Sequence, residues 1–279
     1  MAKEGFRVID SDMHVYDPPD LYLRYMDPKW GERIPRGERR SKHGRVQFKV
    51  GGGTPLRPRS EVVNYGEERV AERYTFAVER SYDSVSQLRG MDMEGLDVAV
   101  LFRTFPLHCD DSFEPEYAND LCRAWNNWIA EFCKEDPERL RASALLTLHD
   151  VDLAVKEARR AVTELGAVCL SVCPGPVNGR RIHDRYFDPL WAEIERLGVA
   201  LCFHPPANPN QEQVARGFYG HPNANIIVLA LRNPVELILG ALQVYWHALA
   251  HRAAGVVHIA IGQEPYFHLH GTILEPTVT

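Results

Sequence analysis

The sequence predicts an α/β fold built on parallel strands. Three times, a helical stretch ends at a glycine and is followed at once by a short, nearly continuous apolar run. These runs cover residues 96–102, 167–172 and 199–204. Strands that are joined by crossover helices pair in parallel, and strands that are buried on both faces are apolar along most of their length. The repeated unit therefore indicates a parallel sheet covered by helices.

The first expected strand lies within residues 7–16, RVIDSDMHVY, and carries polar groups near its end. Asp10, Asp12 and His14 stand at every second position, and alternate side chains of a strand point to the same face. Two carboxylates and an imidazole on one face suggest a divalent metal. A second interpretation stays open, in which the aspartates cap a turn and the histidine is a packed residue with its hydrogen bonds satisfied.

The region after this strand is polar and rich in glycine as far as about residue 80. A short strand is expected within 45–50, followed by the flexible run Gly51-Gly52-Gly53. We interpret residues 31–80 as an insertion or cap within a single barrel-like domain that spans residues 1–279.

The remaining elements follow from capping signals and apolar periodicity. Ser84 with Gln87 resembles a capping box at the start of a helix that ends at Gly95, and Asp188 with Pro189 marks another helix start. The other expected elements are helices over 114–134, 151–165, 189–197 and 234–253, strands over 142–148 and 256–261, and an ambiguous strand over 226–231.

Composition excludes several functional classes. The chain has 279 residues, 45% hydrophobic and 25% charged, with a formal net charge of −6 and no extended basic cluster, so no nucleic-acid partner is expected. No run approaches the roughly 18 apolar residues that span a bilayer, and the start MAKEGFRV lacks an apolar signal segment, so we expect a cytoplasmic protein. Six cysteines without CxxC spacing indicate reduced, buried thiols.

A second imidazole is expected close to the polar groups of the first strand. His204 ends the strand at 199–204, immediately before two prolines. In a barrel, the carboxyl ends of the strands come together and carry the catalytic groups. Asp12, His14 and His204 would then supply three ligands with open positions, the arrangement of a catalytic zinc site. His221 is a candidate for a fourth polar group there, or a surface-loop histidine.

Several segments together resemble a known family. IDSDMHVYDPPDLY, LRGMDMEGLDVAVLF, PGPVNGRRIHDRYFDPLW and LGVALCFH are similar to the amidohydrolase-related proteins, in the amidohydrolase 2 branch that includes aminocarboxymuconate semialdehyde decarboxylase-like enzymes. The resemblance covers about residues 6–240. It implies a TIM-like (β/α)8 barrel with one divalent metal, zinc first and manganese second, acting in hydrolysis or non-oxidative decarboxylation. The family's ligand positions fall on Asp12, His14 and His204.

The chain departs from this family in its last part. Family members carry a metal-binding, catalytic aspartate at the end of the eighth strand, whereas the last aspartate here is Asp188. Only six or seven strands are expected, so the barrel is expected to be incomplete. Glu264 is the nearby carboxylate that could replace the aspartate. An incomplete barrel exposes a strand edge, so we expect compensation by a partner subunit in a homodimer, by rearrangement, or by the 234–253 helix.

Three functions remain open at this point. The first is a metal-dependent hydrolase that acts on a small carbonyl or carboxylate substrate through metal-activated water, with Glu264 moving the proton. The second is a metal-dependent, non-oxidative decarboxylase of an aromatic or unsaturated acid. The third is a catalytically silent barrel with a binding or oligomeric role. Arg103 would bind an anionic substrate in either enzyme, or else pair with an aspartate or glutamate.

Overall fold

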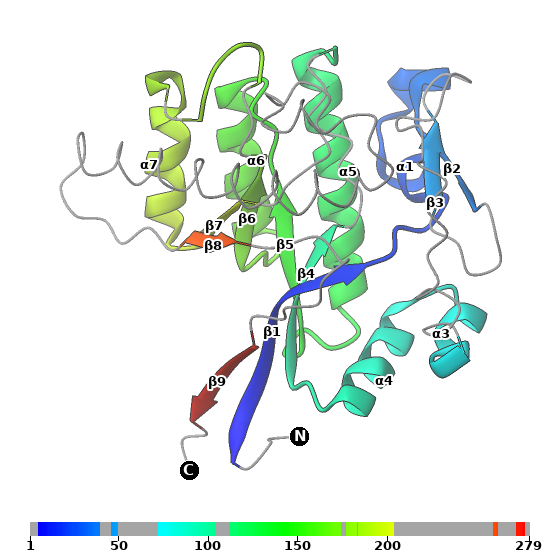
Figure 1. Cartoon of the computed structure of the whole chain (residues 1–279). Coiled ribbons are helices and arrows are strands. Elements are labelled where there is room, and N and C mark those ends of the chain that lie inside the picture. The colour runs from blue at the N-terminus through cyan, green and yellow to red at the C-terminus, as the bar shows by residue number, and fades with distance from the viewer. Residues whose placement is uncertain are drawn as a thin grey trace, which may run out of the picture. The chain divides into compact units, whose positions relative to one another are not determined.

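The computed structural model describes residues 5–39, 46–49, 72–103, 112–173, 177–182, 184–203, 259–261 and 272–276. The chain divides into two compact units. The first unit comprises residues 1–105, 123–143 and 270–279, and the second comprises residues 106–122 and 144–269. Both follow the alternation of strands and helices that the sequence predicts (Figure 1). A single barrel-like domain over residues 1–279 stays a prediction.

The first unit is built on β1, which has a neighbouring strand on each side (Figure 1). β1 pairs in parallel with β4, and β4 pairs in parallel with β5. On the other side, β9 pairs antiparallel with β1 from Phe6 to Asp10. The sequence pattern did not predict β9, which covers part of the edge that β1 would otherwise expose. The bounds are β1 Phe6–Val15, β4 Val98–Arg103, β5 Leu140–Leu145, of which residues 140–143 belong to this unit, and β9 Thr272–Pro276.

Helices of the first unit begin and end close to the expected residues. α4 ends at Gly95, whose φ of 74° gives the left-handed cap that glycine adopts without strain. Its N-cap is Asp83 and not Ser84, because the Asp83 carboxylate accepts a hydrogen bond from the Ser86 amide at 2.9 Å. The bounds are α1 Leu21–Tyr25, η1 Pro28–Arg33, α3 Thr75–Glu79, α4 Ser84–Glu94 and α5 Pro115–Cys133, of which residues from 123 onward belong to this unit.

Part of the expected insertion forms an antiparallel hairpin of β2 (Arg36–Arg39) and β3 (Val46–Lys49). The Gly37 amide donates to the Pro19 carbonyl at 3.0 Å, and a Cβ at Gly37 would lie 2.6 Å from the Pro19 backbone. The ring of Tyr22 packs edge-on against Phe48 at 5.0 Å. The hairpin is therefore held tightly against the segment after β1. Its role as a cap, over residues 31–80, stays a prediction.

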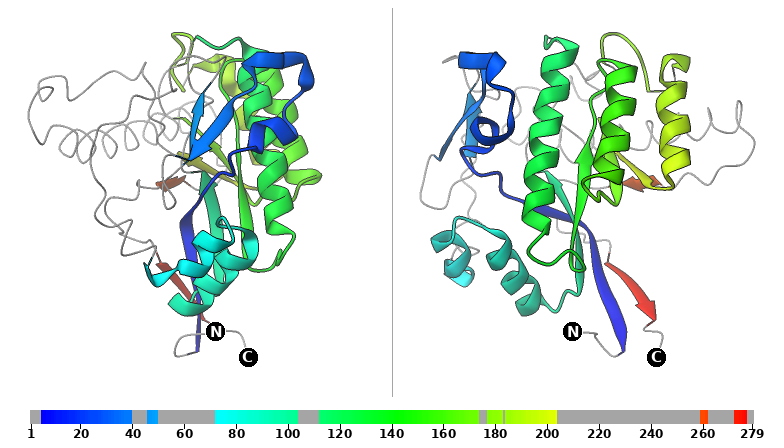
Figure 2. Two further views of the ribbon diagram at one scale, coloured as in Figure 1. Left: turned by 90° about the vertical axis from the view of Figure 1, so that its right-hand side faces the viewer. Right: turned by 180° about the vertical axis from the view of Figure 1, so that it is seen from behind.

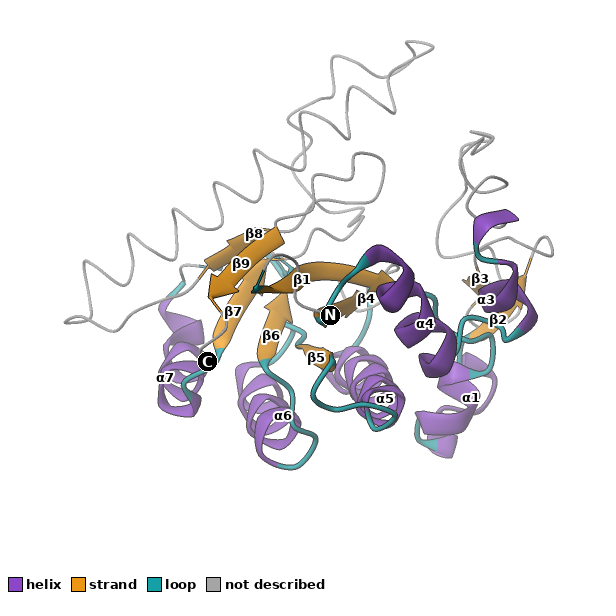
Figure 3. Ribbon diagram, turned by 90° about the horizontal axis from the view of Figure 1, so that it is seen from below, coloured by secondary structure: helices purple, strands orange, loops and turns teal. Residues whose placement is uncertain are grey.

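The second unit contains the parallel strands β6, β7 and β8 in that order. α6 and α7 lie side by side (Figure 2) and cover one face of β6 and β7 (Figure 3). Leu170, Val172, Leu201 and Phe203 alternate along the two strands and form the core with apolar residues of both helices. The bounds are α6 Val151–Thr163, β6 Cys169–Val172, η2 Arg185–Phe187, α7 Asp188–Leu197, β7 Ala200–Phe203 and β8 Ile259–Ile261.

The helix ends of this unit test the capping predictions. Gly198 ends α7 with a φ of 66°, as the helix-glycine-strand pattern predicts. The predicted N-cap at Asp188 is wrong by one residue, because α7 already begins at Asp188 with Phe187 as its N-cap. The cause lies upstream: the Asp184 carboxylate accepts from the Tyr186 amide and starts the short η2 turn, which runs directly into α7.

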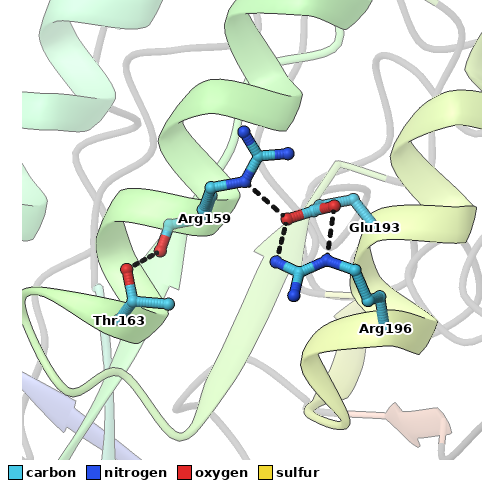
Figure 4. Close-up of polar contacts among 4 residues, drawn as sticks. All are labelled: Arg159, Thr163, Glu193 and Arg196. Atoms are coloured by element: carbon cyan, nitrogen blue, oxygen red, sulfur yellow. Dashed lines mark hydrogen bonds and ion pairs between the residues drawn. The ribbon is translucent and has the colours of Figure 1, made fainter.

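A charged cluster joins α6 to α7 (Figure 4). The Glu193 carboxylate accepts from Arg159 Nε on α6 at 2.9 Å. It also accepts from Arg196 Nε at 2.9 Å and Nη2 at 2.6 Å, one turn further along α7. Hydrogen bonds from Arg196 and Arg159 lower the pKa of Glu193 from 4.5 to about 2.

Some sequence predictions fall on residues that the structure does not describe. These are the helix over 234–253, the ambiguous strand over 226–231, and the candidate site residues His204, His221 and Glu264. No helix among the described residues is both long and apolar enough to span a lipid bilayer.

Candidate functional site

The polar end of β1 contains an irregularity that changes which side chains share a face. Asp10 is level with Ala99 of β4, and Met13 is level with Leu101. Over this stretch β1 advances three residues while β4 advances two, so β1 carries one extra residue, a β-bulge. Bulges re-aim side chains and are common beside active sites.

The bulge separates Asp10 from His14. Neighbouring residues in register point to the same face, so Asp10 lies on the face of Ala99 and Leu101. His14 is level with Phe102 and therefore lies on the opposite face. The expectation that Asp10, Asp12 and His14 all share one face is thus wrong for Asp10, because strict alternation holds only along a regular strand.

Asp10 has a structural part in this arrangement. Its side chain is buried, and Oδ1 accepts a hydrogen bond from the Asp12 amide at 2.9 Å. A hydrogen bond from a backbone amide to the aspartate side chain two residues earlier is the pattern of an Asx turn. The amide that donates it is then not available to a neighbouring strand of the sheet. Asp10 therefore stabilises the bulge that orients the residues after it.

Asp12 and His14 do come together. Nε2 of His14 lies 3.9 Å from Oδ1 of Asp12, and the side chains are 14% and 21% exposed respectively. A carboxylate and an imidazole are ligands suited to zinc and manganese. Metal–ligand bonds of about 2.0–2.2 Å at a tetrahedral angle place two donor atoms about 3.4 Å apart. The observed separation exceeds this by about 0.5 Å, so a small movement of either side chain would bring both donor atoms to one metal ion.

Arg103, the candidate anion-binding residue at the end of β4, is bound to a carboxylate. Its Nε and Nη2 both donate to Oδ2 of Asp17 at 3.1 Å. The guanidinium also lies 5.4 Å from the ring centroids of Tyr22 and Trp125. Pairing with an aspartate or glutamate was the second role that the sequence allowed. Substrate binding by Arg103 stays a prediction.

The other predicted site residues lie in parts of the chain that the structure does not describe. His204, His221 and Glu264 are among them, so the third metal ligand and the proton-transfer residues stay predictions. Within the described ranges, no group of three or more histidine, cysteine, aspartate or glutamate side chains is arranged to hold a metal ion. Asp12 and His14 are thus the described pair on which a metal site would be built.

Two buried polar residues near strand ends were not predicted as site residues from the sequence. Asp17 is buried and follows the β1 strand directly before Pro18-Pro19. His149 is buried four residues after β5, with its Nδ1 2.5 Å from Thr147 Oγ1. A usable signal was present for both, since Asp17 directly follows the strand expected within 7–16 and His149 directly follows the strand expected over 142–148.

Comparison with known proteins matches this chain to one family. The profile of the amidohydrolase family matches residues 9–251. The gamma-resorcylate decarboxylase of Rhodococcus jostii is 37% identical over 145 residues, which are 49% of this chain and 43% of that protein. The 2-amino-3-carboxymuconate-6-semialdehyde decarboxylase of Dictyostelium discoideum is 28% identical over 124 residues, 44% of this chain and 34% of that protein. The matched stretches span less than half the length of these relatives.

Among solved structures, an amidohydrolase from Mycobacterium avium subsp. paratuberculosis is similar in fold. It superposes with a TM-score of 0.65 at 21% identity and covers 88% of this chain and 69% of its own. This similarity shows the α/β barrel fold class that the sequence predicts. The family resemblance read from the sequence motifs is also confirmed, because the same family's profile covers most of the chain.

Proposed function

The chain belongs to the amidohydrolase family, and on that premise we propose that it is a metal-dependent enzyme that decarboxylates an aromatic or unsaturated acid without oxidation. The observation that carries the proposal is the Asp12–His14 pair, re-aimed by a bulge at the end of β1. The similarity to gamma-resorcylate decarboxylase supports the choice of reaction. Asp12, His14 and His204 are the proposed ligands of one divalent metal, zinc or manganese.

The sequence alone placed hydrolysis first and decarboxylation second. Both curated relatives described above are decarboxylases by name. We therefore reverse this order and keep hydrolysis as the second candidate, which the family name and the similarity in fold to an amidohydrolase favour. A small-molecule substrate suits both reactions. The homodimer and the cytoplasmic location stay predictions.

The proposed reaction balances without a redox partner. The bond between the carboxyl carbon and the ring or vinyl carbon breaks, its electron pair stays on the ring or vinyl carbon, and CO₂ leaves. A proton then adds to that carbon, so the site needs a proton donor and no oxidant. Glu264 and His221 are the proposed residues for moving this proton.

Residues of the chain itself define the metal-binding end of the site. Asp12 contributes a negative charge and His14 a neutral donor, so the pair neutralises part of a divalent cation and leaves positive charge for an anionic substrate. A bound divalent cation would supply electrostatic stabilisation of the substrate's carboxylate and neighbouring hydroxyl. Asp12 and His14 are mostly buried, so a substrate bound beside them would be shielded from part of the surrounding water.

Release of ¹³CO₂ from carboxyl-labelled gamma-resorcylate (2,6-dihydroxybenzoate) tests the reaction. The metal-loaded parent protein is compared with the Asp12→Ala/His14→Ala variant, with release followed by NMR. We expect release by the parent and no release above background by the variant. Ester or amide hydrolysis by the parent, without CO₂ release from this acid or from other hydroxybenzoates, would favour the hydrolase. Neither activity in metal-loaded protein would favour the silent barrel.

A further inference from the structure

Arg103 and Asp17 form a buried ion pair behind the end of β1. The side chains are 1% and 0% exposed respectively, and two guanidinium nitrogens donate to one carboxylate oxygen. The flanking aromatic rings of Tyr22 and Trp125 come from α1 and α5. The pair therefore links the segment after β1, the end of β4 and two helices within the first unit.

The position of this pair in the chain ties it to the proposed metal ligands. Arg103 is level with Val15 on β1, one residue after His14. Asp17 is three residues after His14 and is followed by Pro18-Pro19, which restricts the backbone. The carbonyl of Pro19, the second of these prolines, accepts a hydrogen bond from the Gly37 amide of the hairpin. The segment that carries His14 is thus fixed from its carboxyl side by Asp17.

Stability alone is a poor reason for such a pair. Removing two charges from water costs several kcal/mol per ion, and replacing a buried pair with apolar residues of similar volume is often neutral or stabilising. Within the described residues, Asp17 Oδ1 is buried without a hydrogen-bond partner, which adds to the cost. Burial accordingly raises the pKa of the Asp17 carboxyl, although Arg103 opposes this.

What the pair does provide is one defined geometry. A guanidinium is planar, and its directional donors favour particular positions of the carboxylate. Apolar side chains in the same place would pack with less directional preference, so the end of β1 could settle in neighbouring positions. A shift of about half an ångström at this position would equal the difference between the observed and the ideal separation of the Asp12 and His14 donor atoms.

We propose that Asp17 and Arg103 are positioning residues for the metal site: their ion pair holds the end of β1 so that Asp12 and His14 present their donor atoms together. This inference rests on the proposed metal site at those two residues. Outer residues that orient metal ligands typically change metal affinity about 10–100-fold when they are replaced. The pair does not touch the proposed ligands directly, so an effect at the lower end of this range is expected.

The test compares metal affinity with stability in the 279-residue chain. The Asp17→Leu/Arg103→Met variant removes both charges together, and Zn²⁺ and Mn²⁺ affinities are measured by competition with a chelator. Urea unfolding of the metal-free proteins gives their stabilities. We expect an unfolding midpoint close to that of the parent and metal dissociation constants about tenfold higher. Unchanged dissociation constants would overturn the inference.

Two further variants keep the result interpretable. Arg103→Lys preserves the charge but loses the guanidinium geometry, and we expect dissociation constants about threefold higher with the fold intact. If the double variant does not fold, parent-like metal affinity of Arg103→Lys overturns the inference. Glu193→Gln, in the charged cluster of α6 and α7, lowers stability through contacts of its own and should leave metal affinity unchanged. Failure of the parent itself to bind metal would instead overturn the proposed metal site.

Discussion

Two arginine–carboxylate groups in this molecule share their chemistry and differ in their surroundings. In the first unit, the side chains of Arg103 and Asp17 are 1% and 0% exposed. In the second unit, Glu193 is 8% exposed, but its partners Arg159 and Arg196 are 54% and 58% exposed (Figure 4).

The difference in exposure determines how much free energy is lost when one partner of each group is removed. Water replaces a lost partner at the surface cluster, so the cluster stabilises the contact between α6 and α7 only modestly. Water cannot reach the buried pair, so removal of one partner leaves an uncompensated charge. Burial therefore makes the contact costly to break, although the intact pair adds little net stability.

The largest effect is expected for Arg103→Met alone. This variant leaves Asp17 buried without its partner, which typically costs about 3–5 kcal/mol of unfolding free energy. Urea denaturation followed by circular dichroism measures the change at pH 7. The matched control is Asp17→Leu/Arg103→Met, which should recover most of the loss. Equal losses in the single and double variants would show that packing, and not an unpaired charge, accounts for the effect.

The loss of unfolding free energy caused by Arg103→Met should itself depend on pH. Burial raises the pKa of Asp17 above its ordinary value of 3.8, and without Arg103 no nearby guanidinium opposes this. A carboxyl with a raised pKa in the folded state favours folding at low pH, and this advantage is lost as pH rises through the folded pKa. Arg103→Met should thus be more destabilised, relative to the parent, at pH 8 than at pH 5. A constant difference in unfolding free energy would contradict this.

A smaller effect is expected at the surface cluster. Glu193→Gln removes the charge that Arg159 and Arg196 share and should lower the unfolding free energy by about 1–2 kcal/mol at pH 7. The pKa shift of Glu193 alone corresponds to about 3 kcal/mol, and the exposure of both arginines to water reduces this. Glu195→Gln makes the same change of charge two residues along α7 and should cost less. A loss of about 3 kcal/mol or more, as expected when a buried ion loses its partner, would show that the cluster behaves like the buried pair.

The cluster's contribution should disappear in acid. The folded pKa of Glu193 is about 2, below its ordinary value of 4.5, so this group stabilises the fold fully above about pH 4.5 and loses its effect as pH falls towards 2. The difference in unfolding free energy between the parent and Glu193→Gln should shrink over that range. A difference that stays constant down to pH 2 would mean that the charge is not its source.

The smallest expected effect is that of salt, which should change the cost of breaking the surface cluster and not the cost of breaking the buried pair. Screening weakens interactions between exposed charges and affects buried pairs much less. Raising the salt concentration to 1 M should reduce the cost of Glu193→Gln by a few tenths of a kcal/mol, and should leave the cost of Arg103→Met nearly unchanged. Parallel urea titrations of both variants and the parent at two salt concentrations measure this.

Local signals in the sequence were sufficient for much of the fold. Gly95 and Gly198 end their helices in the left-handed conformation that the helix-glycine-strand pattern predicts. The predicted N-caps at Ser84 and Asp188 are each wrong by one residue. Asp83 caps the first helix, and Asp184 starts the turn that precedes the second.

Contacts between distant residues were not predictable in the same way. Strand β9 pairs with β1 from the opposite end of the chain, and a five-residue strand carries too little pattern to reveal this. Asp17 and Arg103 are 86 residues apart, so no local spacing joins them. The bulge after Asp10 depends on an Asx turn, and the alternation rule that correctly grouped Asp12 with His14 overlooked it.

The metal content of the purified protein tests the central claim most directly. Elemental mass spectrometry is applied to the parent, to Asp12→Ala/His14→Ala, and to Asp10→Asn, whose amide oxygen can still accept the bond from the Asp12 amide. We predict about one zinc or manganese per chain in the parent and in Asp10→Asn, as expected for one catalytic site, and none in the double variant. Metal retained by the double variant, or absent from the parent after incubation with both ions, would contradict the account.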